Sequence, residues 1–532
     1  MIEKIIEWSV KNRFIVITAI IFAVAGGIYS MKSMPLDAIP DLSDVQVIVY
    51  TDYEGQSPEV VEDQVTYPLA TAMLNVPFAK NVRGYSFFGT SFVYIIFEDN
   101  TDIYWARSRV LEYLNVVSDR LPENAVPRLG PDATGVGWVF EYVLEDTTGK
   151  HDLQELRSIQ DWYLKYELSA VPGVSEVASI GGYVKQYQVE VDPNRLLAYN
   201  LSISTVKEKI KKSNSDSGGK LLEMGETEFM VRGKGYIKSI EDIENITLKV
   251  NEDGTPVLLK NVAKVHIGPE LRRGIAEWNG EGEAAGGIVV MRYGENALKV
   301  IEKVKERIED LKQGLPEGVE IKTAYDRSGL ILRAVDTLKL KLIEEMIVVA
   351  LICVVFLLHV RSAFVAIFTL PVGILISFIV MKSMGINANI MSLGGIAIAI
   401  GVMVDASVVL VENAHKHLEK YRGKKSHSQI IIDASKEVGP ALFYSLLIIT
   451  ISFLPVFTLQ EQSGRMFKPL AYTKTFAMAA SSFLAITIIP VLMTFFIREE
   501  AFDSNVSKKN RRLISSLMLG SPWILVVAGL LL

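Results

Sequence analysis

The sequence has few of the residues that would point to a disulfide-rich, nucleic-acid-binding or enzymatic protein. Its single cysteine, Cys353, excludes a disulfide framework and a cysteine-based metal site. Its formal net charge of −6 is small for 532 residues and predicts no nucleic-acid partner. Its six histidines show no metal-ligand spacing, and no nucleophile–base set or phosphate-binding loop is present. We therefore expect neither an enzyme nor a bound cofactor.

Long apolar runs are the main feature that the sequence does contain. Hydrophobic residues make up 49% of the chain, and the mean hydropathy is +0.27. Residues 14–31 can span a bilayer, and no small-residue cleavage site follows them, so we expect an uncleaved anchor rather than a signal peptide. After a long stretch of soluble composition, five further runs follow, at residues 342–358, 363–381, 390–411, 441–459 and 476–497. A seventh run begins at Trp523, so we predict a polytopic membrane protein.

The lysines and arginines beside these runs predict how the chain is oriented. Basic residues lie before the first run, between the second and third, after the fourth and after the sixth. With six spans, all four groups fall on one side of the membrane, and their positive charge marks that side as the cytoplasm. The long soluble stretch then lies outside, in the periplasm of a cell with two membranes.

The external stretch contains an internal repeat. Pro77 and Pro172 are 95 residues apart, and Asn100 and Asn194 are 94 apart. In each copy we expect a strand, a helix, two strands joined by a glycine-containing turn, and a further helix, the last being residues 101–121 in the first copy and 202–213 in the second. This order is typical of a ferredoxin-like split βαβ module. Residues 226–325 are rich in strands, and much of this part is expected to complete the second module, although any α/β protein shows some such order.

Asp405 is the most unusual residue of the fourth run, which reads AIAIGVMVDASVVLVEN from Ala397 to Asn413. A carboxylate at the centre of a membrane helix costs about 2.5–3.5 kcal/mol on insertion scales. It either forms hydrogen bonds between helices or relays protons, and a carboxyl group buried in hydrocarbon exchanges protons closer to neutral pH. Glu412 lies two turns further on nearly the same face, where it is either a second relay acid or a solvated interfacial residue.

Methionines accompany this acid. Met391 and Met403 lie in the same run, and methionine is common as filler in membrane helices. Its thioether is also a soft ligand suited to Cu(I) and Ag(I). Gly394, Gly395 and Gly401 form a stripe of small residues that allows close helix packing.

Three motifs resemble those of a known family. The fourth-run sequence GVMVDASVVLVENAHKHLE, with PLDAIPDLSDVQV after the first run and EGQSPEVVEDQVTYPL at Glu54, is similar to the heavy-metal branch of the resistance-nodulation-division (RND) exporters. Within that branch, the similarity is greatest to the copper/silver subgroup. The chain resembles the N-terminal half of such an exporter, and it ends inside the expected seventh span.

The resemblance implies an α+β membrane protein that exports metal ions with the energy of the proton gradient. It implies a homotrimer in the lipid bilayer of the bacterial inner membrane, with a periplasmic adaptor protein and an outer-membrane channel as partners. Asp405 matches the family's proton-relay aspartate, Met391 and Met403 match channel methionines of the copper/silver branch, and Arg83 matches a charged residue near the periplasmic substrate cleft. Met478 or Met493 is the expected methionine partner in the sixth span.

The expected domains follow from the runs and the resemblance together. They are an N-terminal anchor (residues 1–36), a first porter module (37–135), a second porter and docking region (136–340), spans two to six (341–500), and a cytoplasmic linker with the start of the seventh span (501–532). Two other exporter functions stay open, for divalent metals or for organic compounds. A membrane sensor with tandem external modules is a more remote alternative, because a sensor needs a cytoplasmic output domain and the longest cytoplasmic segment expected here, residues 413–441, is short.

Overall fold

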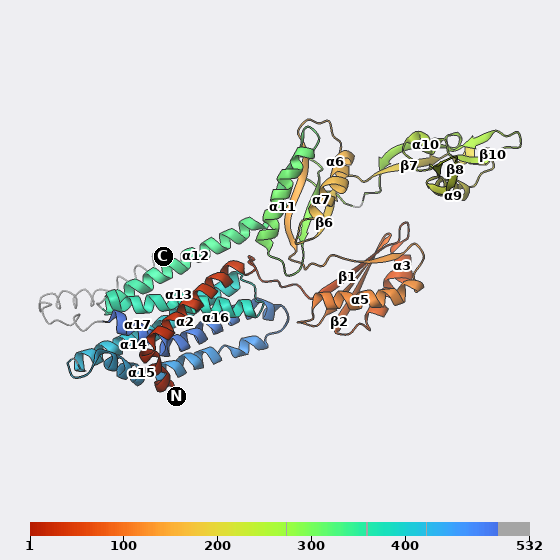
Figure 1. Ribbon diagram of the computed structural model, residues 1–532. Helices are drawn as coiled ribbons and strands as arrows, with labels where there is room; N and C mark the ends of the chain where they lie inside the picture. The colour runs from red at the N-terminus through yellow and green to blue at the C-terminus, as the bar shows by residue number, and fades with distance from the viewer. Residues whose placement is uncertain (273, 358–359, 422, 498–532) are drawn as a thin grey trace. The chain divides into compact units, whose positions relative to one another are not determined.

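The computed structural model describes residues 1–272, 274–357, 360–421 and 423–497, and Figure 1 shows its elements. The chain forms two compact units. The first comprises Met1–Gly137, Arg292–Lys299 and Arg327–Leu532, and the second comprises Trp138–Met291 and Val300–Asp326. The first unit therefore holds the membrane helices together with one external module, and the second unit holds most of the remaining external residues.

The apolar runs of the sequence form long helices. Four described helices are long and apolar enough to cross a membrane, and a fifth span is obtained if α16 and α17, which meet at 52°, count as one. The described part of the second run, residues 342–357, forms the end of α12, and the run from Trp523 lies outside the described residues. The helices of this part are α1 (Ile2–Lys11), α2 (Arg13–Ser33), α12 (Arg327–Leu357), α13 (Val360–Ser383), α14 (Ile390–Tyr421), α15 (His427–Ile451), α16 (Glu461–Ile486) and α17 (Ile488–Phe496).

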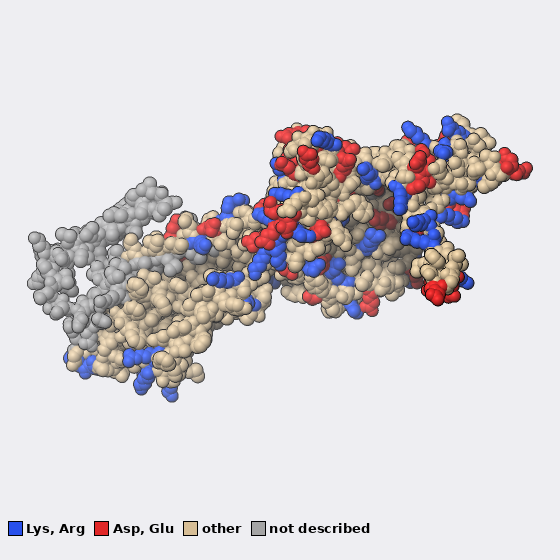
Figure 2. Space-filling view, turned by 45° about the horizontal axis from the view of Figure 1, so that its top comes forward, with Lys and Arg blue, Asp and Glu red and all other residues tan. Residues whose placement is uncertain are grey.

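Charge is distributed over this helical part as the hydropathy predicts. Figure 2 shows its surface with few charged side chains along its length and with lysines and arginines gathered at one end. Because charged groups are costly in hydrocarbon, the stretch with few charges is the part that fits a bilayer.

The first external module is a four-stranded antiparallel sheet covered on one face by helices. Its strand order is β2-β3-β1-β4, the order of a ferredoxin-like fold. Val47, Val49, Val93 and Ile95 alternate along the strands toward the helices and are buried there. Its elements are β1 (Gln46–Asp52), α3 (Pro58–Val61), η1 (Glu62–Thr66), α4 (Tyr67–Met73), β2 (Ala79–Phe87), β3 (Thr90–Phe97), α5 (Ile103–Val117) and β4 (Val126–Leu129).

The second module repeats this plan. Its sheet has the order β14-β5-β13-β6, so each strand has a counterpart at the same place in the first sheet. Both modules also carry a π-helical turn in their first helical segment, η1 and η3. The elements of the second module are β5 (Trp138–Asp146), α6 (Leu153–Ile159), η3 (Gln160–Leu164), α7 (Lys165–Ser169), β6 (Val174–Gly181), β13 (Ala285–Met291), α11 (Ala297–Leu311) and β14 (Val319–Asp326).

A long insertion separates β6 from β13, and here the predicted repeat was wrong in its details. The strand expected after the glycine turn, β7, pairs with β12 in a separate two-stranded sheet, and α9 is not the module's second helix. The true counterparts are β13, which is buried along its whole length, and α11. The insertion contains β7 (Lys185–Val191), α8 (Pro193–Ala198), α9 (Ile203–Ser213), β8 (Ser217–Met224), β9 (Thr227–Gly233), α10 (Ile240–Glu244), β10 (Thr247–Val250), β11 (Pro256–Leu258) and β12 (Ala263–Pro269).

Candidate functional site

Helix α14 carries Asp405 near its middle. The first turn of the helix is fixed by Asn389 and Ser392, each of which accepts a hydrogen bond from the other's backbone N–H, at 2.9 and 2.8 Å. The side chain of Asp405 is exposed and has no hydrogen-bond or ion-pair partner among the described residues. Met403 and Ser407, two residues to either side, are buried, so α14 presents the carboxylate on the face opposite to its packed side.

Met403 lies in a buried cluster with three other methionines. Its side chain is 2% exposed, and its terminal methyl lies against α13, where a Cβ on Gly373 would be only 2.3 Å from the Met403 Cε. The cluster extends along α13, α14 and α16, and Met34 joins it just after the end of α2. Met403 lies against Gly373, which is eight residues, about 12 Å, from Met381 along α13, so the four thioethers do not meet at one point. Its methionines are Met34, Met381, Met403 and Met478.

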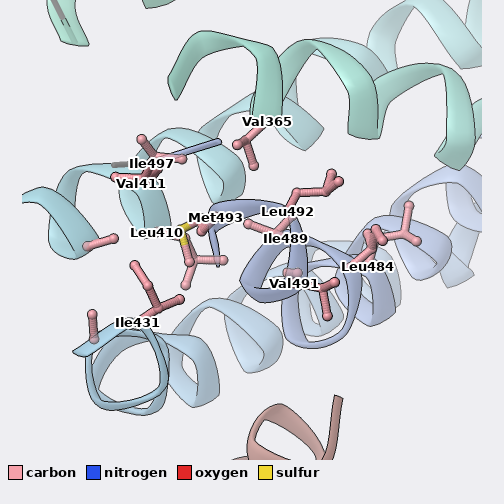
Figure 3. Close-up of a cluster of buried hydrophobic side chains, with 14 of the residues drawn as sticks. Val365, Leu410, Val411, Ile431, Leu484, Ile489, Val491, Leu492, Met493 and Ile497 are labelled. Carbon is pink, nitrogen blue, oxygen red and sulfur yellow. The ribbon is translucent and has the colours of Figure 1, made fainter. Parts of the chain in front are cut away.

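The structure distinguishes the two candidates for the sixth-span methionine. Met478 shares the cluster of Met403, whereas Met493 lies among aliphatic side chains such as Leu410 and Ile489 in a second cluster (Figure 3). Met391 is half-buried in the first turn of α14. Twelve residues of helix, about 18 Å, separate it from Met403, so the two cannot bind the same ion at once.

Glu412 lies toward the C-terminal end of α14, two turns beyond Asp405. Its carboxylate is exposed and lies 2.7 Å from the Lys416 ammonium group on the next turn. An exposed i,i+4 pair of this kind is common on helix surfaces and has little energetic weight. The geometry therefore gives Glu412 less support as a relay acid than it gives Asp405.

Two further polar features of the membrane helices escaped sequence analysis. Thr369 on α13 and Ser407 on α14 share a buried hydrogen bond of 3.1 Å. Lys474 on α16 is 7% exposed, and its Nζ lies 3.4 Å from the ring centroid of Phe453. Lys474 lies two residues before the predicted sixth run, where a lysine is expected to face solvent. Its burial depends on which face of α16 it occupies, and the sequence alone does not show this.

Arg83 lies on β2, on the sheet face of the first module that carries no helix. It lines a hollow of about 550 Å³ together with aromatic side chains. Tyr85 and Tyr94 meet there edge to face at 5.5 Å, and Phe87 and Phe92 do so at 6.0 Å. The hollow thus combines an exposed guanidinium group with four rings.

The described residues contain no group of three or more histidine, cysteine, aspartate or glutamate side chains that could hold a metal ion. A divalent hard or borderline metal would need such oxygen or nitrogen ligands. Met403 and Met478 share one buried cluster, and thioethers are soft ligands that prefer monovalent ions such as Cu(I) and Ag(I).

Comparison with known proteins decides the family. The model of the AcrB/AcrD/AcrF family matches residues 5–517 of the chain. The chain belongs to this family. The AcrB/AcrD/AcrF proteins are RND transporters, so the predicted family, fold class and transporter rather than enzyme character are confirmed.

Relatives within the family carry metal-efflux names. The chain is 58% identical over 522 residues to the cation efflux system protein CusA of Escherichia coli and 57% identical over 524 residues to the putative cation efflux system protein SilA of Salmonella typhimurium, with 97% of this chain and 50% of each relative covered. It is 36% identical over 529 residues to the cobalt-zinc-cadmium resistance protein CzcA of Cupriavidus metallidurans, covering 97% of this chain and 49% of that protein.

A solved structure has the same fold. The crystal structure of a heavy metal efflux pump matches with a TM-score of 0.81 and 32% sequence identity, over 91% of this chain and 48% of that one. The chain thus spans about half the length of the curated relatives it matches.

Proposed function

We propose that this chain is part of a proton-driven exporter of heavy-metal ions, with Cu(I) and Ag(I) as its substrates. The observation that carries the proposal is the placement of two chemistries on one helix. Within two residues, α14 presents the carboxylate of Asp405, which has no partner among the described residues, on one face and buries the thioether of Met403 on the other, in the apolar cluster that also holds Met478. A proton acceptor and a soft-metal ligand therefore share one rigid element.

The mechanism follows from this arrangement. A carboxylate in hydrocarbon needs a partner or water, and we propose that the partner comes from a helix other than those described. Protonation from the periplasmic side removes the charge and changes how α14 fits against its neighbours. Each proton that crosses a potential of 100 mV contributes about 2.3 kcal/mol to this change.

The ion path is proposed from the soft ligands. Met391 at the outer end of α14 and the pair Met403 and Met478 further in lie at different depths, so an ion passes between them in separate steps. Thioethers bind Cu(I) and Ag(I) without losing a proton, which leaves the carboxylate free to respond to pH. The identity to the cation efflux proteins CusA and SilA, 58% and 57%, is well above the 36% to the cobalt-zinc-cadmium resistance protein CzcA, which supports a substrate other than the divalent ions named for CzcA.

The setting is proposed from the charge asymmetry and the family. We expect the transporter in the bacterial inner membrane, with its two modules in the periplasm and basic ends in the cytoplasm. We further propose a homotrimer that passes ions to a periplasmic adaptor protein and an outer-membrane channel.

The test is Asp405→Asn in the full-length transporter, because Asn keeps the side-chain volume and cannot titrate. Proton-driven accumulation of silver in inverted membrane vesicles should be lost, while the expression level and the midpoint of thermal unfolding stay unchanged. Glu412→Gln is the matched control, since it removes an acid of the same helix that is already paired with Lys416. Proton-coupled silver flux that survives in the Asn variant would exclude Asp405 as the relay.

A second candidate is export of organic compounds, which the aromatic hollow around Arg83 favours. Rings and a guanidinium group suit a planar or anionic organic molecule. Tolerance of cells to dyes and to silver, measured side by side, separates the two substrates. Arg83→Ala should lower dye tolerance alone if the hollow binds organic compounds.

A further inference from the structure

The chain between α2 and β1 links the membrane helices to the first module, and we call residues 35–44 the strap. Its first half is bound to the start of α14. The backbone N–H of Ala388 donates to Pro35 at 3.0 Å, Asp37 donates to Ala388 at 3.0 Å, and Ile390 donates to Ala38 at 3.2 Å. Leu36 and Ala388 form a parallel β-bridge. The N-terminal end of the helix that carries Asp405 is thus fixed to the strap by a short backbone ladder.

An ion pair also secures the first half of the strap. Asp37 lies 2.9 Å from the guanidinium group of Arg327, the first residue of α12, which is 4% exposed. The same arginine donates to the carbonyl oxygen of Val136, beyond β4. Because Arg327 is buried, losing its Asp37 partner would leave an uncompensated charge, so this end of the strap moves with α12 and α14.

The second half of the strap is held by a different helix. Arg465, in the first turns of α16, donates to the carbonyl oxygen of Leu42 and to Asp44 Oδ1, both at 3.0 Å, and to Asp99 Oδ1 at 2.5 Å. Asp44 precedes β1 and Asp99 follows β3, and these strands are neighbours in the sheet. One guanidinium group with 17% exposure therefore holds the membrane-facing edge of the first module.

We propose that Arg465 is the positioning residue that transmits movement of α16 to the first external module. The inference rests on the proposed proton-driven export. Helix α14 holds one end of the strap and α16 holds the other, and the two helices touch closely at Gly395. A shift of α14 when Asp405 is protonated therefore acts on the first half of the strap directly and on the second half through α16. The Arg465 contacts with Asp44 and Asp99 pass the shift into β1, which begins just after the strap, and into β3, which ends two residues before Asp99.

A matched control lies at the same junction. Lys80 on β2 and Glu461 on α16 form an ion pair of 2.9 Å in which both side chains are more than half exposed. Exposed pairs contribute little, so Lys80→Gln should keep silver transport within about twofold of the parent. Arg465→Gln removes three charge-assisted or backbone contacts and should lower silver transport about tenfold or more.

The measurement is made on the full-length transporter in proteoliposomes, with silver and proton fluxes recorded together. Arg465→Gln leaves Asp405 intact, so proton influx should continue while silver transport falls, and the number of protons per silver ion should rise. Arg465→Lys keeps the charge but cannot reach all three acceptors, so it should recover part of the silver flux.

Two results would overturn the proposal. One is unchanged silver transport in Arg465→Gln. The other is an equal loss of both fluxes that Arg465→Lys does not relieve, which is what simple destabilisation produces. Failure of the proton-relay function is recognised separately, because Asp405→Asn would then retain coupled silver flux whatever Arg465 does.

Discussion

Gly395 on α14 lies against the backbone of α16 at Leu470. A Cβ at Gly395 would be 2.4 Å from the carbonyl oxygen of Leu470 and 2.2 Å from the hydroxyl oxygen of Thr473. Backbone cannot move aside as a flexible side chain can, so glycine is needed here for the two helices to touch. Gly394, the preceding residue, has no atom within 4 Å of its own Cβ position.

This difference gives a matched pair of substitutions. Gly395→Ala should separate α14 from α16, destabilise the helix pair by about 1–3 kcal/mol through overpacking, and lower silver transport. Gly394→Ala adds the same methyl group into open space and should leave both unchanged. The midpoint of thermal unfolding in detergent and silver export by vesicles are the two measurements. If the two variants had the same unfolding midpoint and the same silver export, the close contact between Gly395 and α16 would be contradicted.

The membrane helices were predictable where apolarity alone defines them. The carboxylate of Asp405 stood out because it interrupts an apolar run. The start of α12 at Arg327 was not predictable, because its first turns are polar and resemble soluble sequence. The different surroundings of Met478 and Met493 were not predictable, because both residues lie in apolar sequence and only the folded helices show which side chains surround each of them.

The repeat was predictable in its order but not in its connections. Strand β13 contains Gly286, whose Cβ would lie 2.1 Å from the carbonyl oxygen of Tyr142. Close backbone approach explains the glycine, but in sequence it weakens the strand pattern. The role of Arg465 was not predictable either, because an arginine between two apolar runs is common. Its importance depends on ion pairs with Asp44 and Asp99, which are distant in the sequence.

Metal choice is tested through the methionines. Replacing Met403 and Met478 together by isoleucine keeps apolarity and approximate volume, at a cost of less than about 1.5 kcal/mol each. Silver tolerance of cells carrying the full-length double variant should fall, and Met391→Ile should lower it as well. Met493→Ile is the control, since Met493 lies among aliphatic side chains and should be replaceable.

The same cells separate the metal classes. Thioethers favour Cu(I) and Ag(I) over Zn(II) and Co(II), so zinc tolerance should be equal in all these variants. Unchanged silver export in the double variant would reduce the methionine cluster to packing. Strong zinc export by the parent would instead place the protein with the exporters of divalent metals.

Membrane orientation is tested with a single new cysteine in the β10–β11 turn. Gly254 is unsuitable because its φ of +84° strains any other residue, whereas Glu252, two residues earlier in the same turn, is exposed. With Cys353 replaced by alanine, Glu252→Cys should react with an impermeant maleimide in intact cells whose outer membrane is permeabilised. Labelling that requires inner-membrane lysis would reverse the proposed topology.

The pH response separates the contact of Arg465 from the proposed relay. A hydrogen bond from Arg465 holds the pKa of Asp99 below its ordinary value of 3.8. A carboxyl group with a lowered pKa in the folded protein stabilises it fully above the unfolded-state pKa, and this contribution is lost only as pH falls through the folded value. The Arg465–Asp99 contact is therefore constant from weakly acidic to neutral pH.

Asp99→Asn should accordingly lower the maximal rate of silver transport without moving its pH profile between about pH 5.5 and 8. Asp405→Glu keeps a carboxyl group but places it one methylene further from the backbone, so it should shift the pH profile of silver transport. Both rates are measured in proteoliposomes at a series of internal pH values with the same imposed gradient. A profile shifted by more than about half a pH unit in Asp99→Asn would mean that Asp99 titrates during transport, and the pH response would then belong to the junction rather than to Asp405.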